Sequence, residues 1–449
     1  MSLTVRGTFL HTPTPGTLEV LDDHLVIIDD DGVITEVVPA ATASGADGPD
    51  VVRPGEGTMV LPGLIDTHVH APQWPQLATG LDLSLDRWLF DYTFPLEARY
   101  ADADFARSVW AELVPSLLAT GTTTAVYYGS IHEPATTALA EACVAFGQRA
   151  FVGRVAMDHP EGAPEWYRDD SATLAVEASA RSVEEVTAVD GGRGLVRPIL
   201  TPRFIPACTD ALLTGMGELA AATGVLVQTH CSEGDWEHTH VLERCGVSDA
   251  TALDRFGLVR DHTVLAHGTH LGDDDRTLLI ERGAGVAHCP LSNAYFANAV
   301  FPAARNIAAG LRVGLGTDIA AGPSSSMLDQ CRHAVTVSRL LDDGVDVERP
   351  PAERGRPGSR IDIPTAFWMA TVGGADLLGL PLGRFAPGCR FDAFVVDPGR
   401  ARGLGIWDGI DDSWERRFEK VVRASTAEHI ATVWVDGREV TPTPVAADR

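Results

Sequence analysis

The chain has 449 residues, with 35 Lys and Arg against 62 Asp and Glu, a formal net charge of -27 and 45% hydrophobic residues. That length is enough to bury a sizeable core in one large domain or in two or three smaller ones. The negative charge repels phosphate backbones and anionic membrane surfaces, and no basic stripe offsets it, so we expect neither nucleic acid nor membrane as a partner.

The first residues and the cysteines indicate the compartment. Residues 1–10 lack a basic segment followed by a long apolar run, and no window approaches the roughly 18 apolar residues of a membrane span. Seven cysteines lie between Cys143 and Cys389 without Cys-x-x-Cys spacing, which argues against a disulfide framework. We therefore expect a soluble, cytoplasmic protein with free cysteines.

Short β-type runs predict strands at both ends of the chain. The runs are residues 25–28, 33–38, 391–396 and 432–435, with Asp-Gly turns at Asp31-Gly32 and Asp436-Gly437. Because the two ends share this texture, we expect residues 1–60 and 385–449 to meet in one composite β domain, a small β-sandwich.

Between residues 61 and 384, short apolar runs alternate with longer amphipathic stretches. The apolar runs are residues 63–65, 123–126, 150–155, 195–199, 225–229, 263–266, 285–287 and 313–315. Helical stretches, such as residues 104–119 and 209–222, separate them. This alternation predicts an α/β fold, a (β/α)₈ barrel of the TIM type, with a doubly wound sheet as the alternative. Catalytic groups of such a barrel follow the strand ends.

Histidines and an aspartate follow four of the expected strands. His68 and His70 are spaced i, i+2 on an extended segment, so their side chains point the same way. His230, His267 and Asp318 follow three later strands. A lone histidine after an apolar run is more often a buried or surface histidine than a ligand. The four strand ends together predict a site for a borderline-soft cation such as Zn²⁺, with one position open to water.

These motifs together resemble a known family. The segment Pro-Gly-Leu-Ile-Asp-Thr-His-Val-His at residues 62–70 resembles the signature of the amidohydrolase superfamily, and the later histidines and the aspartate fall where that superfamily has its remaining site residues. Within it, the guanine deaminases are similar to this chain at residues 71–73, 83–100, 201–204, 230–233, 287–290, 316–318 and 326–329. Each segment is a weak signal, but their order and number make the match specific over essentially the whole chain.

The resemblance implies one Zn²⁺ per chain, held by His68, His70, His230 and Asp318. Several superfamily members hold two metals on a carboxylated lysine, but the single lysine here is Lys420, outside the expected barrel, so one metal is favoured. Zinc lowers the pKa of bound water to about 7 and supplies hydroxide, which attacks an electron-poor ring carbon. Iron in place of zinc stays open.

The chemistry of the site residues indicates which of them transfer protons. Asp318 takes a proton from the water, and His267 orients the water and stabilises charge at the attacked carbon. Glu233 follows His230 by three residues, where the family carries its proton shuttle. Without the flanking pattern, a solvated loop carboxylate would be the better interpretation of Glu233.

Four further residues are candidates for binding the substrate. Gln73 offers a donor and an acceptor to an amide-like purine edge. Arg203 offers a fork of donors that fits a carbonyl oxygen such as the 6-oxo group of guanine, and Phe204 offers a face for stacking. A surface ion pair is the alternative for Arg203. Trp88 either walls the pocket or is a core aromatic residue.

The expected activity is zinc-dependent hydrolytic deamination of guanine to xanthine and ammonia, in a homodimer that serves purine catabolism. Alternatives are a pterin, 8-oxoguanine or another aminopurine as substrate, or a cyclic-amide hydrolase of the same fold. Leu291, Tyr295 and Phe296 are bulkier than the guanine deaminase pattern, so the shape of the pocket rim stays open. The unrelated cytidine-deaminase type is disfavoured because the chain has no Cys-x-x-Cys.

Overall fold

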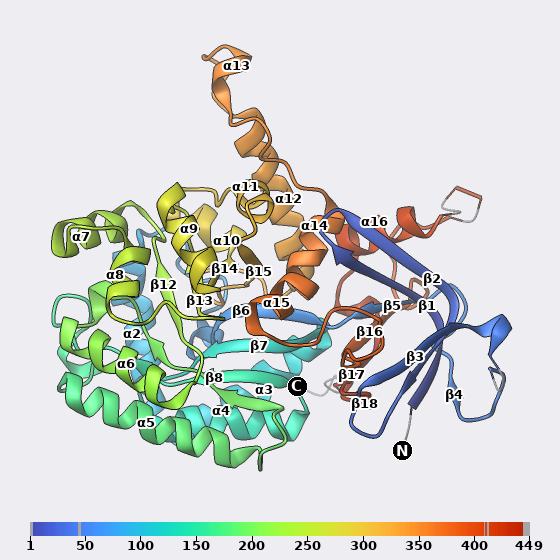
Figure 1. Cartoon of the computed structure of the whole chain (residues 1–449), viewed down its shortest axis with the longest axis horizontal. Helices are drawn as coiled ribbons and strands as arrows, with labels where there is room; N and C mark the ends of the chain where they lie inside the picture. The colour runs from blue at the N-terminus through green and yellow to red at the C-terminus, as the bar shows by residue number, and fades with distance from the viewer. Residues whose placement is uncertain (1–2, 44–45, 408, 411–412, 443–449) are drawn as a thin grey trace.

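The computed structural model describes residues 3–43, 46–407, 409–410 and 413–442 (Figure 1). None of the helices within these ranges combines the length and the apolar character that crossing a bilayer requires. All seven cysteines are free, as predicted, and five of them are buried.

Strands from both ends of the chain form one eight-stranded sheet, in the order β18-β17-β16-β5-β1-β2-β3 with β4 beside β1. Their bounds are β1 Leu3–Thr14, β2 Thr17–Ile28, β3 Ile34–Pro39, β4 Val51–Val52, β5 Met59–Pro62, β16 Ala393–Val396, β17 Ile430–Val435 and β18 Arg438–Glu439. Strand β16 pairs antiparallel with β5, which joins the two ends of the chain. Strands from both ends thus share one sheet, and the turns at Asp31-Gly32 and Asp436-Gly437 connect β2 to β3 and β17 to β18.

The middle of the chain supplies the parallel strands. One four-stranded sheet has the order β10-β8-β7-β6 and a second the order β12-β13-β14-β15, with β9 and β11 forming a short pair. Their bounds are β6 Leu64–His70, β7 Thr122–Tyr128, β8 Arg149–Gly153, β9 Val155–Ala156, β10 Val196–Pro198, β11 Thr201–Pro202, β12 Gln228–Cys231, β13 Val264–His267, β14 Gly285–His288 and β15 Arg312–Leu315. All pair in parallel, as an α/β fold requires.

The two parallel sheets are connected on both sides. A parallel bridge links Leu200 to Val227, next to β11 and β12. On the other side, the Asp318 N–H donates to the His68 carbonyl at 2.9 Å and the His70 N–H donates to the Ile319 carbonyl at 3.0 Å. These hydrogen bonds join the segment after β15 to β6, although about 250 residues separate them in the chain.

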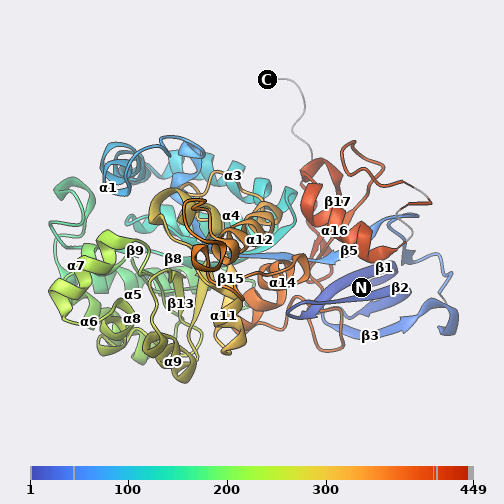
Figure 2. The same cartoon turned by 90° about the horizontal axis from the view of Figure 1, so that it is seen from above.

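Helices cover the parallel strands, and the terminal sheet lies at the other end of the molecule (Figures 1 and 2). The helices are α1 Leu85–Trp88, α2 Phe94–Glu97, α3 Ala103–Ala119, α4 Glu133–Phe146, α5 Ala172–Val189, α6 Asp210–Thr223, α7 Asp235–Cys245, α8 Asp249–Arg255, α9 Asp273–Arg282, α10 Pro290–Ser292, α11 Ala303–Ala308, α12 Met327–Asp343, α13 Pro351–Arg354, α14 Ile363–Trp368, α15 Gly374–Leu378 and α16 Trp414–Ala424. Side-chain caps start several of them: Asp102 accepts from two N–H groups of α3, and Thr209 accepts from one N–H of α6.

A buried ion cluster connects the terminal sheet to the parallel strands. Arg149, the first residue of β8, donates to both carboxylate oxygens of Asp392, at 3.1 and 3.2 Å, and also to Asp436. The Asp436 N–H donates in turn to Asp392 at 2.9 Å. Asp392 precedes β16 and Asp436 lies in the turn between β17 and β18, so one guanidinium holds two parts of the terminal sheet.

We predict that Arg149→Met lowers the free energy of unfolding by about 3–5 kcal/mol, because it leaves the buried carboxylate of Asp392 without its cation, while Asp436 keeps its pair with Arg390. The urea midpoint of the purified protein measures this loss. The control is Arg107→Met, which removes an exposed pair with Asp104 and should leave the midpoint unchanged. Equal midpoints for the two variants would contradict the structural role of the cluster.

Candidate active site

The side chains of His68, His70, His230, His267 and Asp318 converge at the carboxyl ends of the parallel strands. His70 Nε2 lies 3.0 Å from His230 Nε2, and His68 Nε2 lies 3.2 Å from Asp318 Oδ1. His267 Nε2 lies 3.8 Å from Asp318 Oδ2. All five side chains are buried. The structure therefore brings together the five residues that the sequence places at four strand ends.

Neighbouring groups fix the tautomers of two of these histidines. His230 Nδ1 lies 2.7 Å from the Arg203 carbonyl, which only accepts, so the imidazole proton sits on Nδ1. His267 Nδ1 lies 2.9 Å from Asn293 Oδ1 and is protonated for the same reason. Both rings consequently present Nε2 as a lone pair to the centre of the cluster, as metal-ligating histidines do.

The donor set fits a metal ion. Ligand atoms of His68, His70 and His230, and those of His68, His267 and Asp318, form two groups within 4.8 Å. Both ring nitrogens of His68, and Nε2 of His267, make no hydrogen bond within the described part of the chain. Burial lowers the pKa of His68, His70 and His230, because a charged imidazolium would lose its hydration. Neutral imidazoles beside a carboxylate are a suitable environment for Zn²⁺.

Close contacts between β6 and the segment after β15 hold the metal-ligand candidates in place. Asp66 accepts hydrogen bonds from the N–H and the hydroxyl of Thr317, which fixes β6 against the segment after β15. Gly316 packs so closely on β6 that an added Cβ would lie 2.8 Å from the Cβ of His68. Asp318 itself has φ of 51°, a conformation that non-glycine residues adopt at a cost of about 1–3 kcal/mol.

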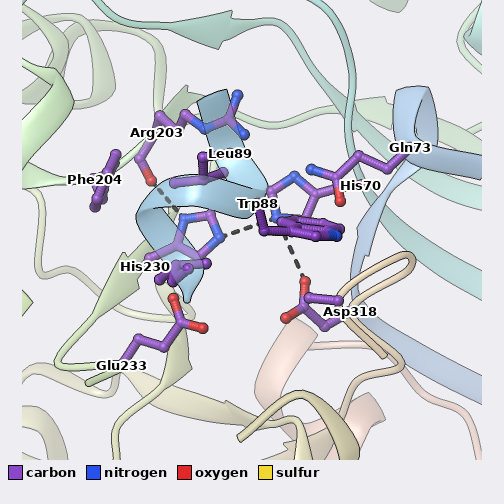
Figure 3. Close-up of a pocket in the computed structure, with 11 residues that line it drawn as sticks. His70, Gln73, Trp88, Leu89, Arg203, Phe204, His230, Glu233 and Asp318 are labelled. Carbon is purple, nitrogen blue, oxygen red and sulfur yellow. Dashed lines mark hydrogen bonds and ion pairs between the residues drawn. The ribbon is translucent and has the colours of Figure 1, made fainter. Parts of the chain in front are cut away.

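A pocket opens beside the cluster (Figure 3). It encloses about 400 Å³, its open mouth included. Its lining consists of His70, Gln73, Leu85, Trp88, Leu89, Arg203, Phe204, His230, Glu233, Asp318 and Ala321. The four predicted substrate-binding residues, Gln73, Trp88, Arg203 and Phe204, thus share one pocket with the predicted proton shuttle.

Comparison with known proteins identifies the family. Residues 59–440 match the model of the amidohydrolase family. The chain belongs to the amidohydrolase family. It is 36% identical to a probable guanine deaminase of Schizosaccharomyces pombe, over 97% of this chain and 82% of that protein. It is 34% identical to the guanine deaminase of Mus musculus, over 98% and 97% of the two chains.

The fold of this amidohydrolase also matches that of a solved structure. The guanine deaminase from C. acetobutylicum, determined with guanine bound in the active site, superposes with a TM-score of 0.88 at 26% identity. The match covers 98% of this chain and 100% of that one. The family resemblance that the motifs indicate is therefore confirmed.

Glu233 is buried on the turn that follows β12. Its Oε2 lies 3.8 Å from His267 Nε2, and its N–H donates to Glu237 Oε2 at 2.7 Å. Its carbonyl accepts from the Thr269 hydroxyl. Burial raises the pKa of Glu233, while His267 opposes that shift. The alternative of a solvated loop carboxylate is wrong.

Arg203 does not form the surface ion pair that the sequence leaves open. Its guanidinium is buried, and Nη1 and Nη2 donate to the two carboxylate oxygens of Glu97 at 2.6 and 3.2 Å. The fork that was expected to face the substrate is thus partly used by Glu97. Sequence interpretation missed Glu97, and also Glu237, Thr269 and Asn293, which fix the catalytic candidates from other elements.

Trp88 is both a wall of the pocket and a buried aromatic residue. Its Nε1 donates to the Thr79 carbonyl at 2.9 Å, and its ring lies 5.1 Å from the ring of Phe296. Phe296 supports Trp88, Leu291 is buried and Tyr295 is half-exposed. None of the three bulky residues is among the described residues that line the pocket.

We predict that Gly316→Ala lowers the metal content of the purified protein several-fold, because the new methyl group displaces His68. Elemental analysis after growth with added zinc measures the loss. Gly272→Ala is the control, since its Cβ would meet only ordinary contact at 3.5 Å and its φ of -79° suits alanine. If Gly316→Ala binds metal as the wild type does, the close packing on β6 has no role in the metal site.

Proposed function

We propose that this protein is a guanine deaminase that hydrolyses guanine at C2 to xanthine and ammonia. The observation that carries the proposal is a single pocket lined by three kinds of group: metal-ligand candidates, a buried carboxyl with a raised pKa, and an Arg-Gln pair that suits an oxopurine edge. The full-length relatives named guanine deaminase support the same substrate.

We further propose that His68, His70, His230 and Asp318 hold one Zn²⁺ per chain. The closely spaced ligand atoms of the three histidines and the inward-facing Nε2 of His230 support this assignment. When bound, zinc lowers the pKa of water to about 7 and so supplies the nucleophile at neutral pH. A lysine carbamate for a second metal has no source in the pocket, since Lys420, in α16, is the one lysine of the chain.

The carboxylates of the chain carry the protons. Asp318 accepts a proton from the attacking water, and His267, held by Asn293, directs that water with Nε2. Glu233 transfers its proton to N3 as the new C–O bond forms at C2 and the C2–N3 double bond becomes single. The exocyclic C2–N bond then breaks, and the amine leaves as ammonia with the proton that Asp318 took from the water. Glu233 regains a proton from the C2 hydroxyl, which becomes the 2-oxo group of xanthine.

The substrate is held by the far side of the pocket. Arg203 and Gln73 donate to the 6-oxo edge of guanine, and the buried rings of Phe204 and Trp88 form apolar walls for the planar base. Adenine carries an amino group where Arg203 needs an acceptor, so its binding leaves buried donors unpaired.

The finer expectations for architecture, location and assembly become part of this proposal. The parallel strands close into one (β/α)₈ barrel over residues 61–384, beside a composite β-sandwich domain of residues 1–60 and 385–449, of which residues 1–2, 44–45, 408, 411–412 and 443–449 lie outside the described part. The enzyme works as a cytoplasmic homodimer in purine catabolism. Light scattering of the purified protein tests the dimer.

We predict that Glu233→Gln lowers kcat by about 10²-fold or more, because it keeps the shape of the side chain and removes its titrating proton. Zinc content should stay at the wild-type level. Ammonia release and elemental analysis on the same preparation measure both. Wild-type turnover, or loss of zinc, would show that Glu233 has a different role.

We predict that guanine is preferred to adenine by about 10⁴-fold in kcat/KM, because a site built to hydrogen-bond one edge rejects an analogue that lacks it. Ammonia release across guanine, adenine, 8-oxoguanine, a pterin and cytosine measures this preference. Turnover of a pterin with guanine inert would keep the deaminase class and replace the substrate. Opening of a cyclic amide without any ammonia release would favour the hydrolase alternative.

A further inference from the structure

Glu97 is a buried carboxylate that contacts two pocket-lining residues without lining the pocket itself. Its Oε1 accepts from Gln73 Nε2 at 2.9 Å and from Arg203 Nη2 at 3.2 Å, and its Oε2 accepts from Arg203 Nη1 at 2.6 Å. Only 2% of Glu97 and 3% of Arg203 is exposed. The ring of Phe94, on the same turn of α2, lies under the guanidinium, and its centroid is 5.1 Å from Arg203 Cζ. The short helix α2 therefore supplies both the carboxylate and the aromatic ring that contact the guanidinium of Arg203.

Glu97 fixes the orientation of both neighbours. Gln73 donates to Glu97 with its amide nitrogen and accepts from the Ala320 N–H with its Oε1 at 3.1 Å, so the amide has one arrangement that satisfies both contacts. Gln73 keeps one N–H and one lone pair for a ligand. Arg203 uses two of its five N–H groups on Glu97 and keeps three.

Glu97 also sets the charge of this side of the pocket. Besides Glu97, the hydroxyls of Tyr128 and Tyr167 lie around Arg203. Tyrosine hydroxyls carry no charge near pH 7. Glu97 is therefore the group that balances the cation of Arg203, while Glu233 and Asp318 serve the opposite side of the site.

This balance matters because substrate and product differ in charge. Guanine is neutral near pH 7, whereas the imide of xanthine is more acidic and ionises close to neutral pH. An unbalanced guanidinium in a low-dielectric pocket would attract the xanthine anion strongly. A guanidinium paired with Glu97 offers hydrogen bonds to the 6-oxo group without a net charge.

We propose that Glu97 is a positioning residue that orients Gln73 and Arg203 and neutralises Arg203, so that the pocket selects the neutral oxopurine and releases its acidic product. The inference rests on the proposed function, since it assumes that guanine and xanthine occupy this pocket.

The test compares xanthine inhibition with catalysis in Glu97→Gln, which keeps the shape and removes the charge. We expect kcat/KM for guanine to fall by about tenfold or more. We also expect competitive inhibition by xanthine to tighten as the pH rises through the pKa of xanthine, because the anion then meets an unbalanced Arg203. In the wild type the inhibition should not tighten over the same range. A general structural defect would not produce this pH response.

Two variants accompany it. Glu97→Asp keeps the charge but shortens the reach, so kcat/KM should fall while xanthine inhibition responds to pH as in the wild type. If Glu97→Gln does not fold, Glu97→Asp tests the positioning role, and inhibition of the wild type that tightens with pH overturns the neutralising role. Glu133→Gln is the matched control, because Glu133 forms a two-oxygen pair with Arg181, at 3.0 Å for each bond, away from the pocket, and it should change neither quantity.

The results separate the two proposals. Xanthine inhibition in Glu97→Gln that does not tighten with pH overturns the neutralising role, and wild-type kcat/KM in Glu97→Asp overturns the positioning role. Absence of ammonia release from guanine by the zinc-loaded wild type overturns the proposed function, and this inference with it.

Discussion

The hydrogen bond from the Asp318 N–H to the His68 carbonyl is the contact on which the site depends. It joins the first parallel strand to the segment after the last one, and so it brings ligands from opposite ends of the middle region to one point. Asp66 and Thr317 add further hydrogen bonds to the same junction, which hold Asp318 in its left-handed conformation. Because Gly316 has no side chain, the two segments can approach this closely.

Much of this arrangement can be predicted from sequence, since chemistry and periodicity coincide at the strand ends. The i, i+2 spacing of His68 and His70 fixes their common side, and each later ligand follows an apolar run that is a strand in the structure. The ends of the strands are predicted less accurately than their presence. The run 225–229 becomes a strand at Gln228–Cys231, because parallel pairing with β13 begins only at Gln228. Strand β2 is longer than the predicted run at 25–28 because polar residues occupy its exposed positions, and β1 was not predicted.

The partners of the catalytic candidates cannot be found in the same way. Glu97 meets Arg203 across 106 positions, and a glutamate on a short helical turn has the same sequence pattern whether it is solvated or buried against an arginine. Glu237, Thr269 and Asn293 are likewise ordinary polar residues until the fold brings them to Glu233 and His267. Periodicity predicts which element carries a residue, but tertiary contacts decide whether its charge is balanced.

Charge affects ligand binding at two levels, over the whole molecule and inside the pocket. The chain carries a net charge of -27, which disfavours the approach of anions over long distances. Within the pocket, Glu97 cancels the charge of Arg203, so no net positive charge on that side attracts an anion that arrives. A phosphorylated purine is therefore disfavoured twice, in its approach and in its binding. A neutral free base avoids both penalties, and it needs only the hydrogen bonds and apolar walls that Gln73, Arg203, Phe204 and Trp88 provide.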